Sequence, residues 1–290
     1  MKRDPLPSNA TLLSVLAHPD DETFGTGGTL ALYARRGVAV YLVCGTRGEV
    51  GEMPADMMKG FSSVAEVRES ELRCAVQTLG LRSVHFLGYR DSGMPGSPEN
   101  HHPLALAAQP VDEVAARIVT QIRRIKPQIV ITFDPIGGYF HPDHIAIHKA
   151  TVRAFELTGR QDYIDPEELP PFQPARLFFQ TINRGFLKAA ILLMQLSGKD
   201  PHKFGKNGDI DMVAIASQNF PIHAKINYHE VADLRDQASD CHESQGGREM
   251  AKGVQKWLQR LFQTTELFML AYPQPVKKQV MYDLFSGLQD

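Results

Sequence analysis

The apolar positions of roughly the first 160 residues form two kinds of segment that alternate along the chain. Continuous apolar runs, which are typical of buried strands, occupy residues 12–17, 38–44, 84–87 and 129–133. Apolar residues at helical spacing lie between and after them, over residues 27–36, 64–79, 111–125 and 143–157. Strands that alternate with helices pair in parallel, so the pattern predicts an α/β fold with a doubly wound, mostly parallel sheet.

The pattern loosens after about residue 160. Residues 165–174 contain four prolines and are typical of a loop. We expect strands at residues 176–182, 211–216 and 266–272, and helices at residues 234–245 and 250–262. The chain is therefore predicted to be a single domain of residues 1–290, with a core over residues 8–160 and an elaborated C-terminal part over residues 161–290.

One apolar stretch invites comparison with a membrane span. Residues 186–196 are mostly apolar but contain Lys188. The stretch is shorter than the ~20 apolar residues that a spanning helix needs. It therefore predicts a helix that is buried or lies at the rim of the molecule.

Composition narrows the class of protein. An apolar content of 43% and a charged content of 22% are typical of a soluble globular protein. The formal net charge of −2 favours neither nucleic acid nor an anionic membrane as a partner. The chain has three cysteines, Cys44, Cys74 and Cys241, which form no C-x-x-C pair. The polar N-terminus is not followed by the apolar core of a signal peptide. We therefore expect a reducing cytoplasm.

Charge is concentrated directly after the first predicted strand. Residues 18–22 hold His18 and the three carboxylates of Asp20, Asp21 and Glu22. Carboxylates at the end of a core strand repel one another and lose hydration, and a bound cation would remove both penalties. This cluster therefore predicts one half of a metal site.

A second cluster follows the strand predicted at residues 129–133. It contains His141, Asp143 and His144 at the start of a predicted helix, where Asp143 can accept a proton from an imidazole and fix its tautomer. The carboxyl ends of parallel strands meet at the edge where open α/β sheets bind ligands. The two clusters together predict a site for one divalent metal. Zinc fits His and Asp ligands with an open position for water, and ferrous iron stays an alternative.

Two other kinds of chemistry are disfavoured. Residues 25–28 (Gly-Thr-Gly-Gly) open a helix after a strand, but Leu30 stands where a dinucleotide fingerprint needs a small residue, and the preceding carboxylates would repel a pyrophosphate. These glycines are predicted instead to allow close packing of the helix. Cys241 and His242 are adjacent and would not face each other on a helix, so Cys241 is expected in the core and not as a nucleophile.

The two clusters, in this order, resemble the LmbE-like or PIG-L family of N-acetylglucosaminyl deacetylases, and the resemblance returns at residues 242–245. Residues 90–94 and 137–144 are similar to the branch that includes the mycothiol-pathway deacetylase and the mycothiol-conjugate amidase. The resemblance implies a Rossmann-like three-layer sandwich.

The resemblance also implies roles for individual residues. His18, Asp21 and His144 would hold the metal, Asp20 would be the general base, and His141 would stabilise the oxyanion or donate a proton.

Further residues are implied on the substrate side. Arg68, Asp91 and His242 would contact the sugar, and Tyr139 would lie near the reacting carbonyl. Asp143 is also expected to be one of the catalytic residues.

The resulting hypothesis is a zinc-dependent hydrolase that removes acetyl from an N-acetylglucosamine-type sugar or conjugate. An amidase for a larger thiol conjugate, a non-catalytic sugar- or metal-binding protein, and a nicotinamide oxidoreductase remain as alternatives. The expected partner is a small molecule, with no nucleic acid and no membrane, and a homo-oligomer stays open.

Overall fold

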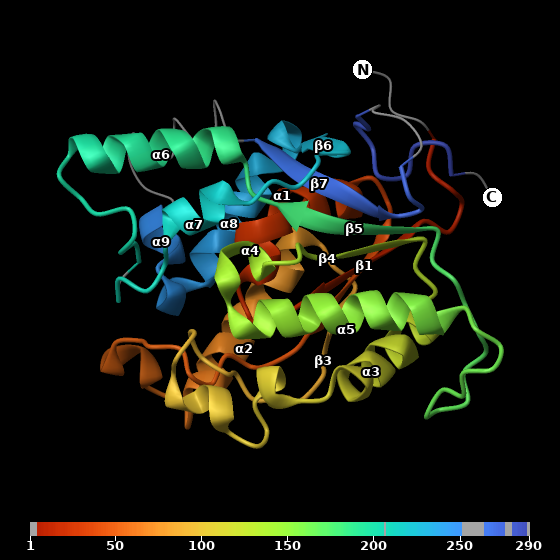
Figure 1. Ribbon diagram of the computed structural model, residues 1–290. Coiled ribbons are helices and arrows are strands. Elements are labelled where there is room, and N and C mark those ends of the chain that lie inside the picture. Colours follow the sequence, from red (N-terminus) through yellow and green to blue (C-terminus); the bar gives the residue numbers. More distant parts are fainter. Residues whose placement is uncertain (1–4, 206, 251–263, 276–279, 289–290) are drawn as a thin grey trace.

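The computed structural model describes residues 5–205, 207–250, 264–275 and 280–288. These residues include a seven-stranded sheet, shown in Figure 1. Its strands are β1 (Thr11–Leu16), β2 (Ala39–Cys44), β3 (Ser83–Phe86), β4 (Ile129–Phe133), β5 (Arg176–Thr181), β6 (Ala224–Asn227) and β7 (Thr265–Tyr272). The strand order is β3-β2-β1-β4-β5-β7-β6, and β7 runs antiparallel to both of its neighbours while the other pairs are parallel. The predicted mostly parallel α/β sheet is confirmed.

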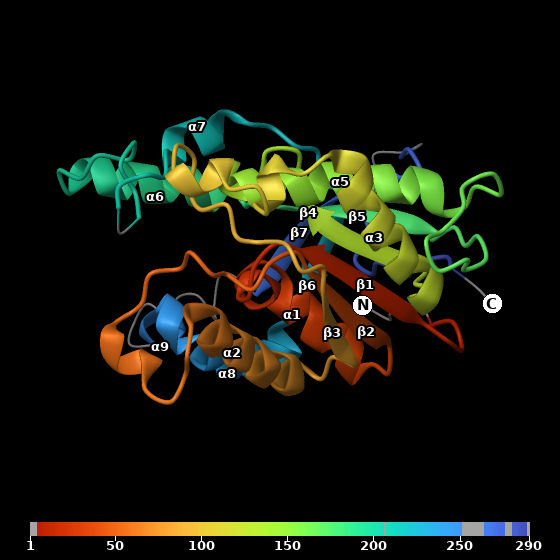
Figure 2. The ribbon, with the colours of Figure 1, turned by 90° about the horizontal axis from the view of Figure 1, so that it is seen from below.

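Helices cover both faces of this sheet (Figure 2). The α-helices are α1 (Asp21–Arg35), α2 (Val64–Leu79), α3 (Val111–Ile125), α4 (Gly137–Phe140), α5 (Pro142–Thr158), α6 (Arg184–Leu196), α7 (Met212–Ser217), α8 (Ala232–Cys241) and α9 (Gly247–Met250). Short 3-10 helices are η1 (Ala55–Met58), η2 (Pro98–His101), η3 (Leu106–Ala108), η4 (His229–Val231) and η5 (Glu243–Gln245). Helices α3 and α5 pack on one face, and α1, α2 and α8 lie on the other, which makes three layers.

The core explains why the two central strands read as continuous apolar runs. Every residue of β4 is buried, as are the residues of β1 after Thr11, because helices cover both faces at the centre of the sheet. Helix α2 has clear end signals: the Ser63 side chain accepts from the N–H of Glu66, and Gly80 ends the helix at φ 76°. Local signals and burial therefore agree in this half of the chain.

The C-terminal half contains the main errors of prediction. Residues 211–216 were expected to form a strand, but they form α7, because Asp211 caps the N–H of Ala214 at 2.9 Å. Met212 and Ile215 of this helix pack in a small apolar cluster with Leu187 of α6. The helix expected at residues 234–245 ends at Cys241, and η5 follows it. In the N-terminal half, α1 begins at Asp21, six residues before its expected start. The helix expected at residues 250–262 lies almost entirely outside the described residues.

The apolar stretch at residues 186–196 lies within α6, at the rim of the molecule (Figure 1). Leu192, Leu193 and Leu196 are exposed on it. Among the described residues, no helix is both long enough and apolar enough to cross a membrane.

A disulfide joins Cys74 of α2 to Cys241 at the end of α8, with a Cα–Cα distance of 5.8 Å. Cys44 is buried and free. Cys241 is therefore half of a crosslink and not a plain core residue. Because disulfides are rare in a reducing compartment, this pairing removes the cysteine argument for a reducing cytoplasm. The sequence did not reveal the pair, since 167 residues separate the two cysteines and they form no local motif.

The glycines of α1 serve close packing, as predicted. A Cβ atom at Gly28 would lie 2.1 Å from the ring of Tyr228, which follows β6. The N–H groups of Gly28 and Thr29 also donate to the two carboxyl oxygens of Glu266 on β7, at 2.9 and 2.8 Å. The glycine therefore lets the C-terminal strands approach the helix that begins at the charged cluster.

Candidate active site

The two charged clusters meet at the point where the direction of the strand order reverses. The chain passes from β1 to β2 and β3 on one side, and then returns to place β4 on the other side of β1. The loops after β1 and β4 diverge at this switch point and leave a crevice, which is the usual ligand site of such sheets. His18 lies in the loop after β1, and His144 lies in the first turn of α5.

Two imidazole nitrogens and one carboxylate from these clusters form a compact triangle. His18 Nδ1 lies 3.2 Å from His144 Nε2, and Asp21 lies 3.5 Å from the first atom through Oδ2 and 3.3 Å from the second through Oδ1. Ligands of a tetrahedral ion at about 2.0–2.1 Å would be separated by about 3.3–3.4 Å. The triangle therefore has the dimensions of a His/Asp/His site for a divalent metal.

The outer hydrogen bonds of both imidazoles direct their lone pairs into this triangle. His18 Nε2 lies 3.0 Å from Asp143 Oδ2, and His144 Nδ1 lies 3.0 Å from the carbonyl oxygen of Gly137. When each of these nitrogens carries the proton and donates it, the nitrogen that faces the triangle is unprotonated and can bind a metal. Asp143 is itself fixed by the N–H and hydroxyl of Ser92. It thus occupies the orienting position that the sequence predicted.

The electrostatics of the site also fit a cation. Burial alone would lower the pKa of His18. The surrounding carboxylates more than offset this effect and hold the pKa well above its ordinary value; they belong to Asp91, Asp143 and Asp21. Positive charge is therefore favourable at this point, and a divalent ion would supply it in place of the proton.

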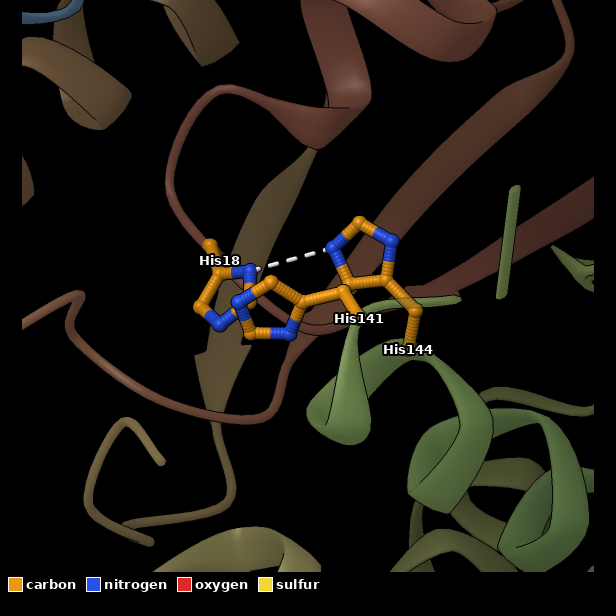
Figure 3. Close-up of side chains that lie close together, drawn as sticks. All are labelled: His18, His141 and His144. Atoms are coloured by element: carbon orange, nitrogen blue, oxygen red, sulfur yellow. Dashed lines mark hydrogen bonds between the residues drawn. The ribbon is translucent and has the colours of Figure 1, made fainter. Parts of the chain in front are cut away.

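His141 is the third imidazole of the site, and Figure 3 shows its ring beside those of His18 and His144. Donor atoms of these three rings lie within 4.8 Å of one another. His141 caps α5, because its Nδ1 accepts the N–H of Asp143 at 3.2 Å. Burial and the two neighbouring imidazoles hold the pKa of His141 far below its ordinary value. The neutral ring therefore carries its proton on Nε2 and can donate it to an oxyanion.

Asp20 adjoins the predicted ligand Asp21 and has an unusual backbone, with φ 120°. This conformation is strained for a residue with a side chain, so neighbouring contacts must maintain it. The N–H of Asp20 donates to Glu22 Oε2 at 3.0 Å. Arg68 Nη2 donates to Asp20 Oδ2 at 3.0 Å and to the carbonyl oxygen of Pro19 at 2.6 Å. Burial raises the pKa of Asp20 to about 6, against the opposing effect of Arg68.

His242 does not lie where a sugar could touch it. Its side chain is 0% exposed, and Nε2 lies 2.7 Å from Glu22 Oε1. The expectation of a direct substrate contact is therefore wrong for this structure, because a side chain without accessible surface offers nothing to a ligand. His242 instead supports Glu22, which in turn holds the N–H of Asp20.

Arg68, Asp91 and Tyr139 lie at the site, but two of them are nearly covered. Arg68 and Asp91 are each 4% exposed; the first bonds the Asp20 loop, and the second lies 3.5 Å from His18 Nε2. Their contacts with a sugar stay predictions. The ring of Tyr139 meets His144 edge-on, with 5.0 Å between centroids.

A cavity of about 390 Å³ opens from the triangle towards the C-terminal half of the chain. Asp21, Tyr139 and His144 line one end of it. The other walls come from α1, β5, α6, α8 and β7 and include Phe24, Gln180, Asn183, Phe186, Arg235 and Glu266. The elaborated C-terminal part therefore supplies much of the wall that a substrate would meet.

The sequence did not predict the roles of several residues at the site. Glu22 was noticed in the cluster but had no partner until the fold brought His242 to it. Ser92 fixes Asp143, and its only signal was its place in the segment after a predicted strand. Glu266 and Arg235 belong to segments without a chemical motif, so no local signal could have found them.

Comparison with known proteins places the chain in a family. The family model described as GlcNAc-PI de-N-acetylase (PIG-L) matches residues 13–155. A relative from Acidothermus cellulolyticus, a 1D-myo-inositol 2-acetamido-2-deoxy-alpha-D-glucopyranoside deacetylase, is 37% identical over 250 residues, which cover 81% of this chain and 79% of the relative. The chain belongs to the PIG-L family.

Solved structures support the PIG-L fold. The conserved protein TT1542 from Thermus thermophilus matches with a TM-score of 0.59 and 25% identity, over 92% of this chain and 96% of that one. N,N'-diacetylchitobiose deacetylase from Pyrococcus horikoshii matches with a TM-score of 0.62 and 18% identity, over 91% of this chain and 84% of that one. The PIG-L model match spans both charged clusters but ends before the strands that build the far wall of the cavity.

Proposed function

We propose that this protein is a metal-dependent hydrolase that removes the acetyl group from an N-acetylglucosamine-type sugar or sugar conjugate. The observation that carries the proposal is the triangle of His18, Asp21 and His144, whose three groups lie 3.2–3.5 Å apart. Asp20 directly precedes Asp21 in the chain. The names of PIG-L relatives, which include a deacetylase of an inositol-linked acetamido sugar, support the substrate class.

We assign the metal to His18, Asp21 and His144, with zinc as the favoured ion and ferrous iron as the alternative. A bound divalent metal lowers the pKa of water and polarises an amide carbonyl. The hydrogen bonds that His18 donates to Asp143 and that His144 donates to the Gly137 carbonyl oxygen keep both imidazoles oriented for this role.

Asp20 and His141 handle the protons of the reaction. Asp20, with a pKa of about 6, is largely ionised near neutral pH and can take a proton from the attacking water. His141 donates from Nε2 to the oxyanion of the tetrahedral intermediate. The leaving amine then receives a proton from Asp20 in its acid form, because the neutral His141 can donate a hydrogen bond but not release its proton. A purely binding protein would have no use for a base held in this strained position, which favours an enzyme.

A second candidate activity is cleavage of a larger acyl group from a thiol conjugate. The cavity of about 390 Å³ favours it, because an acetyl group fills only a small part of such a space. Under the leading proposal, the same space receives the part of the sugar conjugate that lies beyond the amide.

The test combines metal analysis with product detection. Purified protein should contain or bind one zinc or iron per chain, and acetate should be released from a panel of N-acetylglucosamine derivatives. Release of a bulky acyl-cysteine without acetate would favour the amidase. Failure to bind either metal would refute the proposal, and metal and sugar binding without turnover would indicate a non-catalytic protein.

A further inference from the structure

The Cys74–Cys241 disulfide lies on the wall of a second cavity. The elements that line this cavity are not the ones that carry the metal triangle. This cavity has a volume of about 480 Å³ and is lined by residues of α2, α8 and the segments that flank them. Cys74 is exposed and Cys241 is half-buried. The crosslink therefore faces a cavity that a small molecule can enter, and exposed disulfides are typically the labile or regulatory ones.

Each of the two crosslinked helices supports Asp20 from a different side. Helix α2 carries Arg68, which bonds Asp20 Oδ2 and the carbonyl oxygen of Pro19. Cys241 is followed directly by His242, which holds Glu22, and Glu22 accepts the N–H of Asp20. The disulfide thus closes a ring of contacts around the strained backbone of Asp20.

A second link between the same elements limits what loss of the disulfide can do. Glu71 of α2 accepts from both the N–H and the hydroxyl of Ser244, each at 2.7 Å. This link does not depend on the oxidation state of the cysteines. Reduction should therefore loosen the His242 side of the ring without separating α8 from α2.

We propose that Cys74–Cys241 is a thiol–disulfide exchange site at which a small-molecule thiol sets the turnover of the enzyme through the position of Asp20. The proposal rests on the hydrolase function for its effect on turnover, but not for the exchange itself. Oxidised protein is the more active form, because both supports of Asp20 are then tied together.

The exchange needs two equivalents of a small thiol. The thiolate of the first attacks Sγ of Cys74, the more exposed residue of the pair, so that a mixed disulfide forms and Cys241 leaves as a thiolate that takes up a proton. The second thiol attacks the sulfur of the small molecule in the mixed disulfide. This step releases the oxidised small-molecule disulfide and Cys74, so two electrons pass from the two thiols to the protein.

The charge of the cavity selects among thiols. Among the lining residues that the structure describes, Glu71, Asp240 and Glu243 carry carboxylates and Arg248 carries a guanidinium. Arg248 already pairs with Glu243 at 2.7 Å. The negative charge of these described residues should favour a cationic or neutral thiol over an anionic one, and salt should weaken this preference.

The first experiment counts thiols and needs no enzymatic activity. After incubation with a small oxidised disulfide, the denatured full-length protein should react with one equivalent of a thiol reagent, from Cys44; after reduction it should react with three. At equal thiolate concentration and low salt, cysteamine should reduce the protein faster than 2-mercaptoethanesulfonate. Three thiols after oxidation would overturn the exchange site, and equal rates for the two reagents would overturn the selection by charge.

The second experiment measures turnover of the metal-loaded enzyme in the two oxidation states. Reduction should lower kcat by up to about tenfold with little change in KM or metal content, since displacement of a catalytic group by less than 1 Å has effects of this order. Reoxidation should restore kcat. The double variant Cys74→Ala/Cys241→Ala should show the lowered kcat and should not respond to thiols, which also controls for removal of metal by the thiol.

Equal kcat in the oxidised and reduced enzyme, or a thiol response of the double variant as large as that of the wild type, would refute the link to Asp20. Absence of any hydrolase activity would refute the proposed function instead, and the thiol counts and reduction rates would still decide whether the exchange site exists.

Discussion

Replacement of His242 by alanine tests the buried support of Asp20. The substitution removes the partner of the Glu22 carboxylate, and both side chains of this pair are 0% exposed. No solvent can reach the carboxylate that is left behind. Glu22 must then remain charged and unpaired, take up a proton, or draw the backbone away from its position.

The expected cost follows from this burial. Removal of one partner from a buried, hydrogen-bonded ion pair costs about 3–5 kcal/mol. Removal of the surviving charge should recover part of the loss, so the double variant Glu22→Gln/His242→Ala should be more stable than His242→Ala alone. In the wild type, the N–H of Asp20 donates to Glu22, so disturbance of Glu22 should also lower kcat by about 10–100-fold.

The cost should depend on pH in a defined direction. Burial lowers the pKa of His242, but Glu22 more than offsets this and holds it above its ordinary value. A histidine whose pKa is raised by folding contributes stability that is fully present below its unfolded pKa of about 6.5 and is lost as the pH rises through the folded value. The difference between wild type and His242→Ala should therefore be larger at pH 6 than at pH 9.

The assay is urea unfolding of the metal-free protein, so that metal binding does not contribute to the measured free energy. The matched control is His202→Ala, because His202 and Asp211 form a histidine–carboxylate pair with a 3.0 Å contact on the exposed surface. This control should unfold like the wild type. Similar behaviour of the two alanine variants, or a double variant no more stable than His242→Ala, would show that the buried pair does not act as described.

Three further results are expected. Asp20→Asn should keep its metal and lower kcat by about 10²–10⁴-fold, whereas His144→Ala should lose the metal, and equal metal contents by elemental analysis would contradict these roles. Gly28→Ala should destabilise the protein by about 1–3 kcal/mol, because the new Cβ would lie 2.1 Å from the Tyr228 ring, and an unchanged urea midpoint would count against this packing. Burial raises the pKa of Glu266 from 4.5 to about 7, so the stability that this residue provides below pH 4.5 is lost as the pH rises through about 7. The free energy of unfolding of Glu266→Gln, taken relative to that of the wild type, should therefore increase by about 3 kcal/mol across this range. Parallel pH profiles of the two proteins would contradict the shift.

The N-terminal half of the fold was predictable because local and global signals agree there. In β4 and α3 the predicted and observed bounds coincide, since a strand buried on both faces reads as a continuous apolar run and an amphipathic helix shows its period directly. In the C-terminal half the signals are weaker. Residues 212–217 resemble a strand in composition, and the cap at Asp211 and the packing against α6 decide that they form a helix.

Short local patterns are enough to predict the chemistry of the site: which residue types gather after two strands, and that they suit a divalent metal. Those clusters are local, and each is only a few residues long. Tertiary structure alone decided the partners of these residues, because His242 reaches Glu22 across 220 positions and Cys74 reaches Cys241 across 167. No local pattern encodes such pairings; they arise only when α2, α8 and the loop after β1 pack together.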